Sequence, residues 1–475
     1  MDGDRQDGRP QRSGGPDVLR TIREVHRRAL RSPYIPNTDS DIRTMLETIG
    51  LAEVSDLFAH IPGDLRLDKE LDVPGPMSEL ELRRFADGLS RENRNLDECI
   101  CFLGAGVYDH YIPATVRAIT ARSEFYTSYT PYQPEMSQGN LQVIFEFQTM
   151  ISQLTGMEVS NASMYDGASA LAEAALMADN ITSRNQWLVS RSVHPAYRRT
   201  METYAWGSGS VMKETPLCGI ETDPDGISRL MSDTVSCVVI QYPNFFGLVE
   251  DVHLIEEIAH RHGAMLVVCA DPISLGLLKP PGEFNADICV AEGQSLGVHP
   301  GYGGPLLGLM ACKKEHVRQM PGRLVGGTTD ANGCRSYTLT LQTREQHIRR
   351  ERATSNICTN QALNALAATV YLATLGPEGL RNTARLCFDK SQYASRLASE
   401  SEGFAIPFGY SFVKEFVLKT NKPIKSLNAE LLKRGIIGGL DLGSFYSELA
   451  GHMLVCVTEK HTREQIEYFA ECLNA

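Results

Sequence analysis

The sequence lacks the features that define several classes of protein. Its 475 residues hold no apolar run long enough to cross a membrane, since even Ala264–Ala270 has only the length of a strand. The twelve cysteines form no Cys-x-x-Cys pair and the twelve histidines show no ligand spacing, which argues against a structural zinc site. Positive charge is also scarce, and a formal net charge of −12 argues against a nucleic-acid partner.

The scattered cysteines point to a reducing compartment. Cys237, Cys269 and Cys289 lie in apolar runs, where a free thiol packs as a small hydrophobic group. Cys334 and Cys358 flank one loop, and a redox pair there stays open beside the interpretation that both thiols are inert. Because the N-terminus also has no apolar signal core, the sequence predicts a cytoplasmic protein.

The chain divides into three parts by composition and periodicity. Residues 1–32 are polar and rich in Arg, Gly and Pro, which predicts a disordered extension. Residues 33–343 alternate short apolar strands with helices, a rhythm that predicts a mostly parallel sheet covered on both faces. Residues 344–475 are predicted to form a smaller α+β C-terminal domain, because two long helices there precede separated strands and helices.

Hydrophobic periodicity gives the expected elements. The strands are expected at Trp187–Ser190, Cys237–Gln241, Met265–Ala270, Ile288–Ala291, Leu307–Ala311, Phe412–Leu418 and Met453–Val457. The helices are expected at Ser40–Ile49, Ser78–Leu89, Glu135–Leu154, Asp251–His262, Asn360–Leu375, Glu378–Ser399, Leu427–Arg434 and Thr462–Leu473.

Asp271 and Ser295 have the spacing of the acid and the lysine in a pyridoxal-phosphate site, but the second residue is a serine. Asp271 closes the apolar run Ala264–Ala270, and Ser295 follows some two dozen residues later, after the next expected strand. Pyridoxal-phosphate enzymes pair an acid with the pyridinium nitrogen and use a lysine to form the Schiff base. Serine cannot form an imine, so the sequence predicts only half of such a site.

The neighbouring lysines offer no replacement. No lysine occurs between Lys279 and Lys313. Lys279 precedes a Pro-Pro-Gly turn and Lys313 ends a strand in a charged cluster, so both are predicted to be solvated.

Two further segments fit a cofactor pocket, and each also has an ordinary interpretation. Gly167 and Ser169 begin an alanine-rich helix and would offer free backbone N–H groups to a phosphate, or simply make a tight helix start. His194 follows an expected strand, where its flat ring would stack on a pyridine ring or be an ordinary surface group. Asp271 would serve equally as an N-cap of the next turn.

Five segments closely resemble the N-terminal half of the glycine-cleavage P-protein, the glycine decarboxylase. The resemblance runs from about Pro33 to the C-terminus, and in many bacteria and archaea this enzyme is split into two chains, of which this one resembles subunit 1. The segments are Tyr34-Ile-Pro-Asn-Thr38, Gly104-Ala-Gly-Val-Tyr-Asp-His-Tyr-Ile-Pro113, Thr127-Ser-Tyr-Thr-Pro-Tyr-Gln-Pro-Glu135, Gly293-Gln-Ser-Leu-Gly297 and Arg352-Ala-Thr-Ser-Asn-Ile-Cys-Thr-Asn-Gln361.

This resemblance implies a fold and explains the serine. The family has an aspartate-aminotransferase-like fold (fold type I), and the catalytic lysine belongs to the other subunit. Counting from Asp287 places Ser295 at the lysine position. Ser169, His194 and Asp271 then correspond to the phosphate, ring-stacking and pyridinium sites of the catalytic paralogue. We call these four residues the relic site (Ser169, His194, Asp271 and Ser295), and expect pyridoxal phosphate on the partner subunit.

The resemblance also implies which residues would complete the partner's active site. Fold-type-I active sites lie at a subunit interface, so loops of this chain are expected to wall the partner's glycine pocket and to reach its cofactor phosphate. Tyrosines present a flat face and a hydroxyl, and Thr and Asn donate to a phosphate or carboxylate. The candidate wall residues are Tyr108, His110, Tyr129, Thr130 and Tyr132, and the candidate phosphate contacts are Thr354 and Asn356.

The implied activity is shared between subunits. The family decarboxylates glycine and passes the aminomethyl group to the lipoyl arm of the H-protein, here in an expected α₂β₂ assembly. Two alternatives stay open: a self-sufficient enzyme using another lysine such as Lys279, and an inactive regulatory or scaffold paralogue. A visible cofactor band in the isolated chain would favour the first alternative, and a neighbouring gene for a lysine-bearing homologue would favour the shared enzyme.

Overall fold

The computed structural model describes residues 36–67, 72–353, 355–409 and 411–474, so the expected extension 1–32 lies outside it. Contacts divide the chain into two compact units, the first ending at Glu92 and the second beginning at Asn93. The first unit contains α2 (Asp39–Ile49) and α3 (Glu79–Arg91). Both helices begin with a reciprocal capping box, at Thr38 and Ser78, and both were expected from the sequence.

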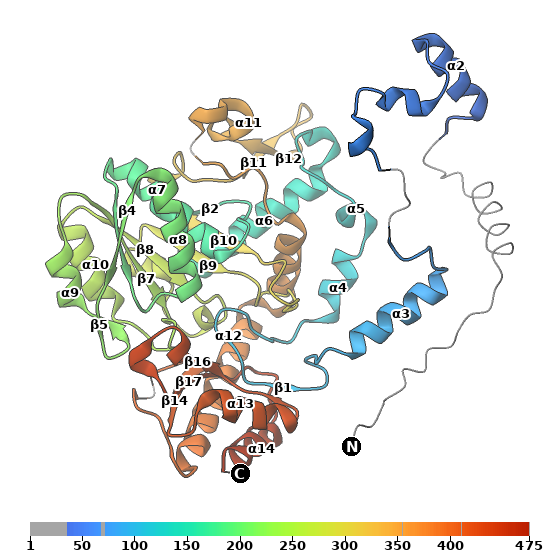
Figure 1. Cartoon of the computed structure of the whole chain (residues 1–475). Coiled ribbons are helices and arrows are strands. Elements are labelled where there is room, and N and C mark those ends of the chain that lie inside the picture. The colour runs from blue at the N-terminus through green and yellow to red at the C-terminus, as the bar shows by residue number, and fades with distance from the viewer. Residues whose placement is uncertain (1–35, 68–71, 354, 410, 475) are drawn as a thin grey trace, which may run out of the picture. The chain divides into compact units, whose positions relative to one another are not determined.

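A seven-stranded sheet forms the centre of the second unit (Figure 1). Its order is β2-β10-β9-β8-β7-β3-β4, and the neighbours from β9 to β4 are all parallel, whereas β10 runs antiparallel to β9 and β2. The expected mostly parallel sheet is therefore confirmed. The strands are β2 (Val159–Ser160), β3 (Gln186–Ser190), β4 (Val211–Thr215), β7 (Val235–Tyr242), β8 (Met265–Ala270), β9 (Ile288–Glu292) and β10 (Gly308–Cys312).

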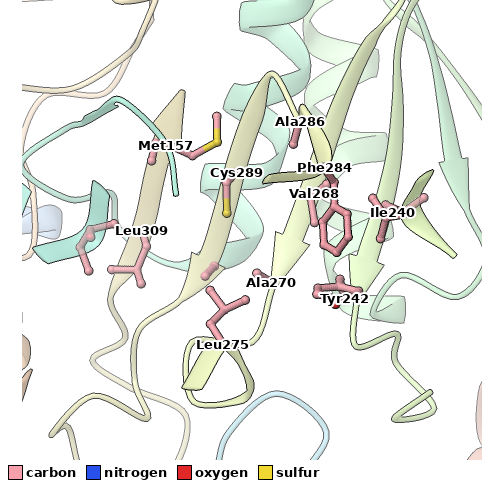
Figure 2. Packing of buried hydrophobic residues seen from close by; sticks show 14 of the residues in the cluster. Met157, Ile240, Tyr242, Val268, Ala270, Leu275, Phe284, Ala286, Cys289 and Leu309 are labelled. Atoms are coloured by element: carbon pink, nitrogen blue, oxygen red, sulfur yellow. The ribbon is translucent and has the colours of Figure 1, made fainter. Parts of the chain in front are cut away.

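Successive side chains of the central strands enter two different hydrophobic layers. Val238 and Ile240 pack with the helices α6, α9, α10 and α12, whereas Cys237 and Val239 pack with α7 and α8. Figure 2 shows the first layer, in which Ile240, Val268 and Leu309 project from β7, β8 and β10 of the same sheet. The helices are α6 (Gln138–Thr155), α7 (Gly167–Thr182), α8 (Pro195–Ser208), α9 (Pro224–Leu230), α10 (Val252–Arg261) and α12 (Ala362–Glu400).

The C-terminal part folds around its own antiparallel sheet, β13-β14-β17-β16. The two expected long helices appear as α12, which breaks where Gly376 adopts φ 61° and ψ −178° just before Pro377. Helix α12 packs in both hydrophobic clusters, and the expected division between residues 343 and 344 stays a prediction. The elements are β13 (Phe404–Ala405), β14 (Glu415–Thr420), α13 (Ile424–Lys433), β16 (Leu440–Asp441), β17 (His452–Cys456) and α14 (Arg463–Asn474).

Several smaller elements complete the second unit. A parallel bridge joins β1 to β15, and the hairpin β11–β12 packs against α6 through Val325 and Leu339. The elements are β1 (Ile100–Cys101), α4 (Ala114–Thr120), α5 (Ser123–Tyr126), β5 (Leu217–Cys218), β6 (Glu221–Thr222), β11 (Leu324–Thr329), β12 (Arg335–Thr340), α11 (Gln346–Arg349) and β15 (Ile436–Ile437). No described helix combines the length and apolarity needed to cross a membrane.

A short loop after β7 joins the large sheet to the C-terminal sheet. Phe245, Phe246 and Leu248 leave the large sheet and pack in the hydrophobic cluster of β14 and β17. Gly247 lies between them with φ +90°, and a Cβ there would stand 2.0 Å from the carbonyl oxygen of Glu415. The backbone of this loop therefore contacts β14 at a distance that only glycine permits.

Replacing Gly247 with alanine is expected to loosen this contact. The substitution adds a backbone clash to the cost of a left-handed conformation, so we expect a loss of about 3 kcal/mol or more in the free energy of unfolding. Gly209→Ala is the matched control, because Gly209 has φ +77° with nothing within 4 Å of a Cβ. That control should lose only about 1 kcal/mol in denaturant titrations. Equal losses in the two variants would contradict the proposed close approach.

Candidate functional site

The relic site lies at the carboxyl edge of the parallel strands. Asp271 follows β8 directly, Ser295 lies shortly after β9, and His194 follows β3. Ligands of open α/β sheets bind at this edge. The sequence had predicted that the three residues follow strands, and the structure confirms those positions. A cavity of about 40 Å³ remains there, and His194 and Asp271 help to line it. That volume has room for about three water molecules.

Glu292 occupies the start of α7, the helix end that one of the two interpretations assigned to a phosphate. Its Oε2 accepts from the backbone N–H of Gly167 at 2.9 Å, and its Oε1 accepts from those of Gln294 and Leu307 at 3.0 and 2.8 Å. Asp166 caps the helix by accepting from the Ser169 N–H at 2.8 Å. Of the two interpretations of Gly167 and Ser169, the structure favours the tight helix start, because two carboxyl groups of the chain already accept from these N–H groups.

Asp271 is paired with a lysine from the C-terminal part of the chain. The Lys414 ammonium donates to Asp271 Oδ1 at 2.7 Å, and both side chains are nearly inaccessible, at 4% and 13% exposure. Burial disfavours the charged form of each group, but their mutual attraction lowers the pKa of Asp271 and raises that of Lys414. Oδ2 of Asp271 also accepts from the Ser274 N–H at 3.0 Å, so the N-cap interpretation holds as well.

His194 is fixed as a neutral imidazole. Its Nδ1 accepts from the Ala196 N–H at 3.1 Å, so Nε2 carries the proton and donates to the Ala105 carbonyl at 2.9 Å. Burial lowers the pKa of His194, in agreement with the neutral form. The ring also lies 4.8 Å from that of Tyr197 and 4.9 Å from that of Phe245.

The segment 104–110 folds over the relic site within this chain. The Tyr108 N–H donates to Gln294 Oε1 at 2.8 Å, the Tyr108 hydroxyl donates to Glu415 at 2.8 Å, and the Lys414 ammonium lies 3.4 Å from the ring centre of Tyr108. His110 is 4% exposed and its Nδ1 lies 2.7 Å from Glu459. Both candidate wall residues thus have partners inside the chain, and their assignment to a partner's glycine pocket stays a prediction.

Pyridoxal phosphate does not fit the pocket as this chain builds it. A carboxyl group lies on the helix N-terminus where the cofactor's phosphate would bind, and an ammonium lies on the acid where the pyridinium would bind. The buried hydroxyl of Ser295 has no hydrogen-bond partner among the described residues, and it cannot form an imine.

The second group of candidates surrounds the tract from Tyr126 to Tyr132. Tyr129 is 89% exposed, Thr130 is half-buried, and Tyr132 is 45% exposed. The buried guanidinium of Arg323 donates to the Tyr132 hydroxyl at 3.3 Å and to the Cys358 carbonyl at 2.7 Å. Arg323 thereby links this tract to the segment that contains the exposed Asn356. Thr354 lies outside the described residues.

Apolar grooves extend from this tract along α6 and α12. One groove of about 580 Å³ is lined in part by Phe125, Val143 and Leu366, and another of about 490 Å³ in part by Leu154 and Leu372. Tyr129 lines a smaller hollow that shares Phe125, Val143 and Leu366 with the first groove. Grooved apolar surface of this extent is typical of sites that bind another molecule.

The two candidate redox thiols and Lys279 lie at the surface. Cys334 and Cys358 are exposed free thiols, and a redox pair between them stays a prediction. Lys279 is exposed. Lys313 is not solvated as predicted, because its ammonium donates to Asp287 at 2.6 Å.

Sequence reasoning missed the residues that fill the relic site. Glu292 ends β9 three positions before Ser295, and an acid at the end of a buried strand was a signal that could have found it. Lys414 lies more than a hundred positions from Asp271, but it precedes the apolar strand β14. A charged pair, Lys414-Glu415, at the start of a buried strand needs internal partners, and that was a second available signal.

The family model described as "Glycine cleavage system P-protein" matches residues 32–473 of the chain. The chain belongs to this P-protein family. It is 54% identical over 442 residues to the "Probable glycine dehydrogenase (decarboxylating) subunit 1" of Desulforamulus reducens, covering 93% of this chain and 99% of that protein. The protein of the same name from Geobacillus kaustophilus is 51% identical over 436 residues, covering 92% and 97%.

Solved structures agree with this P-protein assignment. The inhibitor-bound crystal structure of glycine decarboxylase (P-protein) of the glycine cleavage system superposes with a TM-score of 0.85 at 44% identity, covering 93% of this chain and 99% of that chain. Glutamate decarboxylase from Lactobacillus brevis, at 12% identity and a TM-score of 0.65, shares the fold alone. The chain therefore has the predicted pyridoxal-phosphate fold type I.

The Glu292 carboxyl group gives this P-protein chain a pH dependence that can be measured. Burial raises the pKa of Glu292 from 4.5 to about 7, although three backbone N–H groups oppose that rise. The unfolded chain therefore releases the proton at lower pH than the folded chain, so folding stability falls between about pH 4.5 and pH 7 and is level above. The full effect is at most about 3 kcal/mol.

Glu292→Gln is expected to remove this part of the pH dependence, because glutamine does not titrate. The free energy of unfolding, measured in denaturant at pH 5 and pH 8, should fall less with pH in the variant than in the unsubstituted chain. Glu283→Gln at an exposed position is the control and should leave the pH profile unchanged. A Glu292→Gln profile parallel to that of the unsubstituted chain would contradict the assignment.

Proposed function

We propose that this chain is the lysine-free subunit of a glycine dehydrogenase (decarboxylating) of the glycine cleavage system. It acts with a second, lysine-bearing subunit whose active site it completes. The observation that carries this proposal is the relic site, in which residue 295 is a serine, Glu292 accepts from the N-terminus of α7 and Lys414 binds Asp271. The similarity to proteins named subunit 1, which spans nearly their whole length, supports the same conclusion.

The overall reaction decarboxylates glycine and passes the aminomethyl group to the lipoyl arm of the H-protein. Pyridoxal phosphate on the partner subunit supplies the electron sink for the loss of CO₂. This chain's contribution is to enclose the reacting groups, because decarboxylation requires a fixed substrate orientation and exclusion of water. The exposed hydroxyl and amide groups of Tyr129, Tyr132 and Asn356 suit that role, since they can donate to a carboxylate or a phosphate.

The grooves along α6 and α12 support a hetero-oligomer. Phe125, Val143 and Leu366 present apolar surface there beside the exposed Tyr129. Covering such a surface with a subunit of the same fold would place the tract from Tyr126 to Tyr132 at the subunit boundary. The simplest closed arrangement of two such pairs is an α₂β₂ heterotetramer.

The alternatives explain fewer of these observations. Lys279 is exposed and lies over the ring of Phe284, so it has no enclosed pocket in which to form an imine. Lys414 is enclosed, but Asp271 raises its pKa and keeps it protonated, which leaves no free amine to act as a nucleophile. A scaffold paralogue needs no exposed polar tract beside its apolar groove.

The isolated chain is expected to be colourless and inactive, and to gain activity only with its partner. Glycine–CO₂ exchange should be absent for either subunit alone and appear in an equimolar mixture. Sedimentation of that mixture should show a species heavier than either chain. The proposal would be wrong if the two subunits sediment separately, or if this chain alone exchanges CO₂.

Tyr129→Phe is expected to slow glycine–CO₂ exchange in the assembled enzyme by roughly ten- to a hundredfold. That range corresponds to the loss of one hydrogen bond of ~1–3 kcal/mol made in the transition state. Tyr468→Phe on α14 is the control, because this partly exposed tyrosine lies on the C-terminal helix and outside the grooves. If both assembled variants keep full activity, the tract serves in packing and the assignment of Tyr129 should be withdrawn.

A further inference from the structure

A cofactor pocket that loses its cofactor is left with polar groups that need new partners. Backbone N–H groups at a helix N-terminus and a buried carboxylate each cost free energy when they are removed from water without a partner. Two such groups are present at opposite ends of the relic site, at Gly167 and at Asp271. Both have partners supplied by this chain.

The partners take the hydrogen-bonding positions of the missing cofactor at each end. At the N-terminus of α7, where an anion is favoured, the Glu292 carboxyl group accepts from Gly167, Gln294 and Leu307. At the end of β8, where a cation is favoured, the Lys414 ammonium binds Asp271. One buried acidic group thus takes the place of the phosphate, and one buried cation takes the place of the protonated pyridine nitrogen.

The space between these two ends is closed by the loop before α4. Ala105 accepts from His194 Nε2 and donates its N–H to Glu415 at 2.7 Å, so this loop is attached to both domains. Gly106 adopts φ +99°, and a Cβ there would lie 3.1 Å from His194 Nε2. The ring position above His194 is therefore covered by backbone, and two small cavities of about 40 and 20 Å³ lie beside Asp271.

We propose that Glu292 and Lys414 are built-in replacements for the two charged ends of pyridoxal phosphate, and that they close the relic site against the cofactor. The missing lysine is then only one of three barriers to cofactor binding in this chain. Lys414 also joins the C-terminal sheet to the large sheet, so the filled site fixes the two domains relative to each other. This inference does not depend on the proposed function, because it concerns the chain alone.

The test restores the lysine with and without the two replacements. Full-length Ser295→Lys, full-length Ser295→Lys/Glu292→Ala/Lys414→Ala and the unsubstituted chain are incubated with pyridoxal phosphate. An amine at position 295 that can reach the aldehyde forms an imine with loss of water, and borohydride then adds hydride to the imine carbon. Peptide mapping by mass spectrometry measures the adduct at position 295 and separates it from adducts on surface lysines.

We expect no adduct at position 295 in the single variant and a clear adduct in the triple variant. The triple variant should also bind pyridoxal phosphate at least tenfold more tightly than the single variant in equilibrium dialysis. A matched control, Ser295→Lys/Glu283→Ala/Lys279→Ala, removes one exposed acid and one exposed lysine instead. It should behave like the single variant, since it leaves the filled site intact.

Two results would overturn the inference. The first is an adduct at position 295 in the single variant with the same cofactor affinity as in the triple variant. The second is a folded triple variant, verified by circular dichroism, that still excludes the cofactor. If the triple variant does not fold, Glu292→Ala and Lys414→Ala are each measured alone with pyridoxal phosphate in dialysis. At least one of them should then bind it tenfold more tightly than the unsubstituted chain, and equal affinity in all three would refute the inference.

Discussion

The buried ion pair between Asp271 and Lys414 is the charged contact between the large sheet and the C-terminal sheet of the second unit. It joins the end of a parallel strand to the start of the C-terminal sheet, and both side chains are nearly inaccessible to water. A buried charge without its partner is strongly unfavourable, so each residue requires the other. The loop from Gly104 to His110 packs against this pair. The ring of Tyr108 lies against the Lys414 ammonium, and its hydroxyl donates to the adjacent Glu415.

In this chain the interior edge of the sheet is closed, and the exposed outer face is the surface suited to contact with another subunit. The interior edge of the sheet, where such enzymes hold their cofactor, is here hydrogen-bonded within the chain, and it is joined to the start of the C-terminal sheet by the Asp271–Lys414 pair. The outer face along α6 and α12 stays open, and the tract around Tyr129 is exposed beside it. Polar groups kept exposed near an apolar groove suit contact with another subunit, whereas a closed interior suits rigidity.

The central parallel strands β3, β7, β8 and β9 were predicted well because each is a short apolar run that periodicity detects. Elements with mixed burial were missed: the edge strand β4 is mostly exposed, and the hairpin β11–β12 is hydrophobic on one side only. Among the candidate residues, Asp271, His194 and Ser295 were placed at the correct edge of the sheet. Their partners were not predicted, because hydrogen bonds such as that from His194 to Ala105 join segments far apart in the chain.

The sequence by itself determined the family, the fold type and the absence of the lysine, since all three depend on local patterns and on residue identity. Tertiary structure alone decided what fills the place of the cofactor. Lys414 and Asp271 meet only because the C-terminal sheet packs on the edge of the large sheet, and Glu292 reaches Gly167 only because β9 ends beside the start of α7. Long-range electrostatic pairing depends on that packing, and no spacing along the chain encodes it.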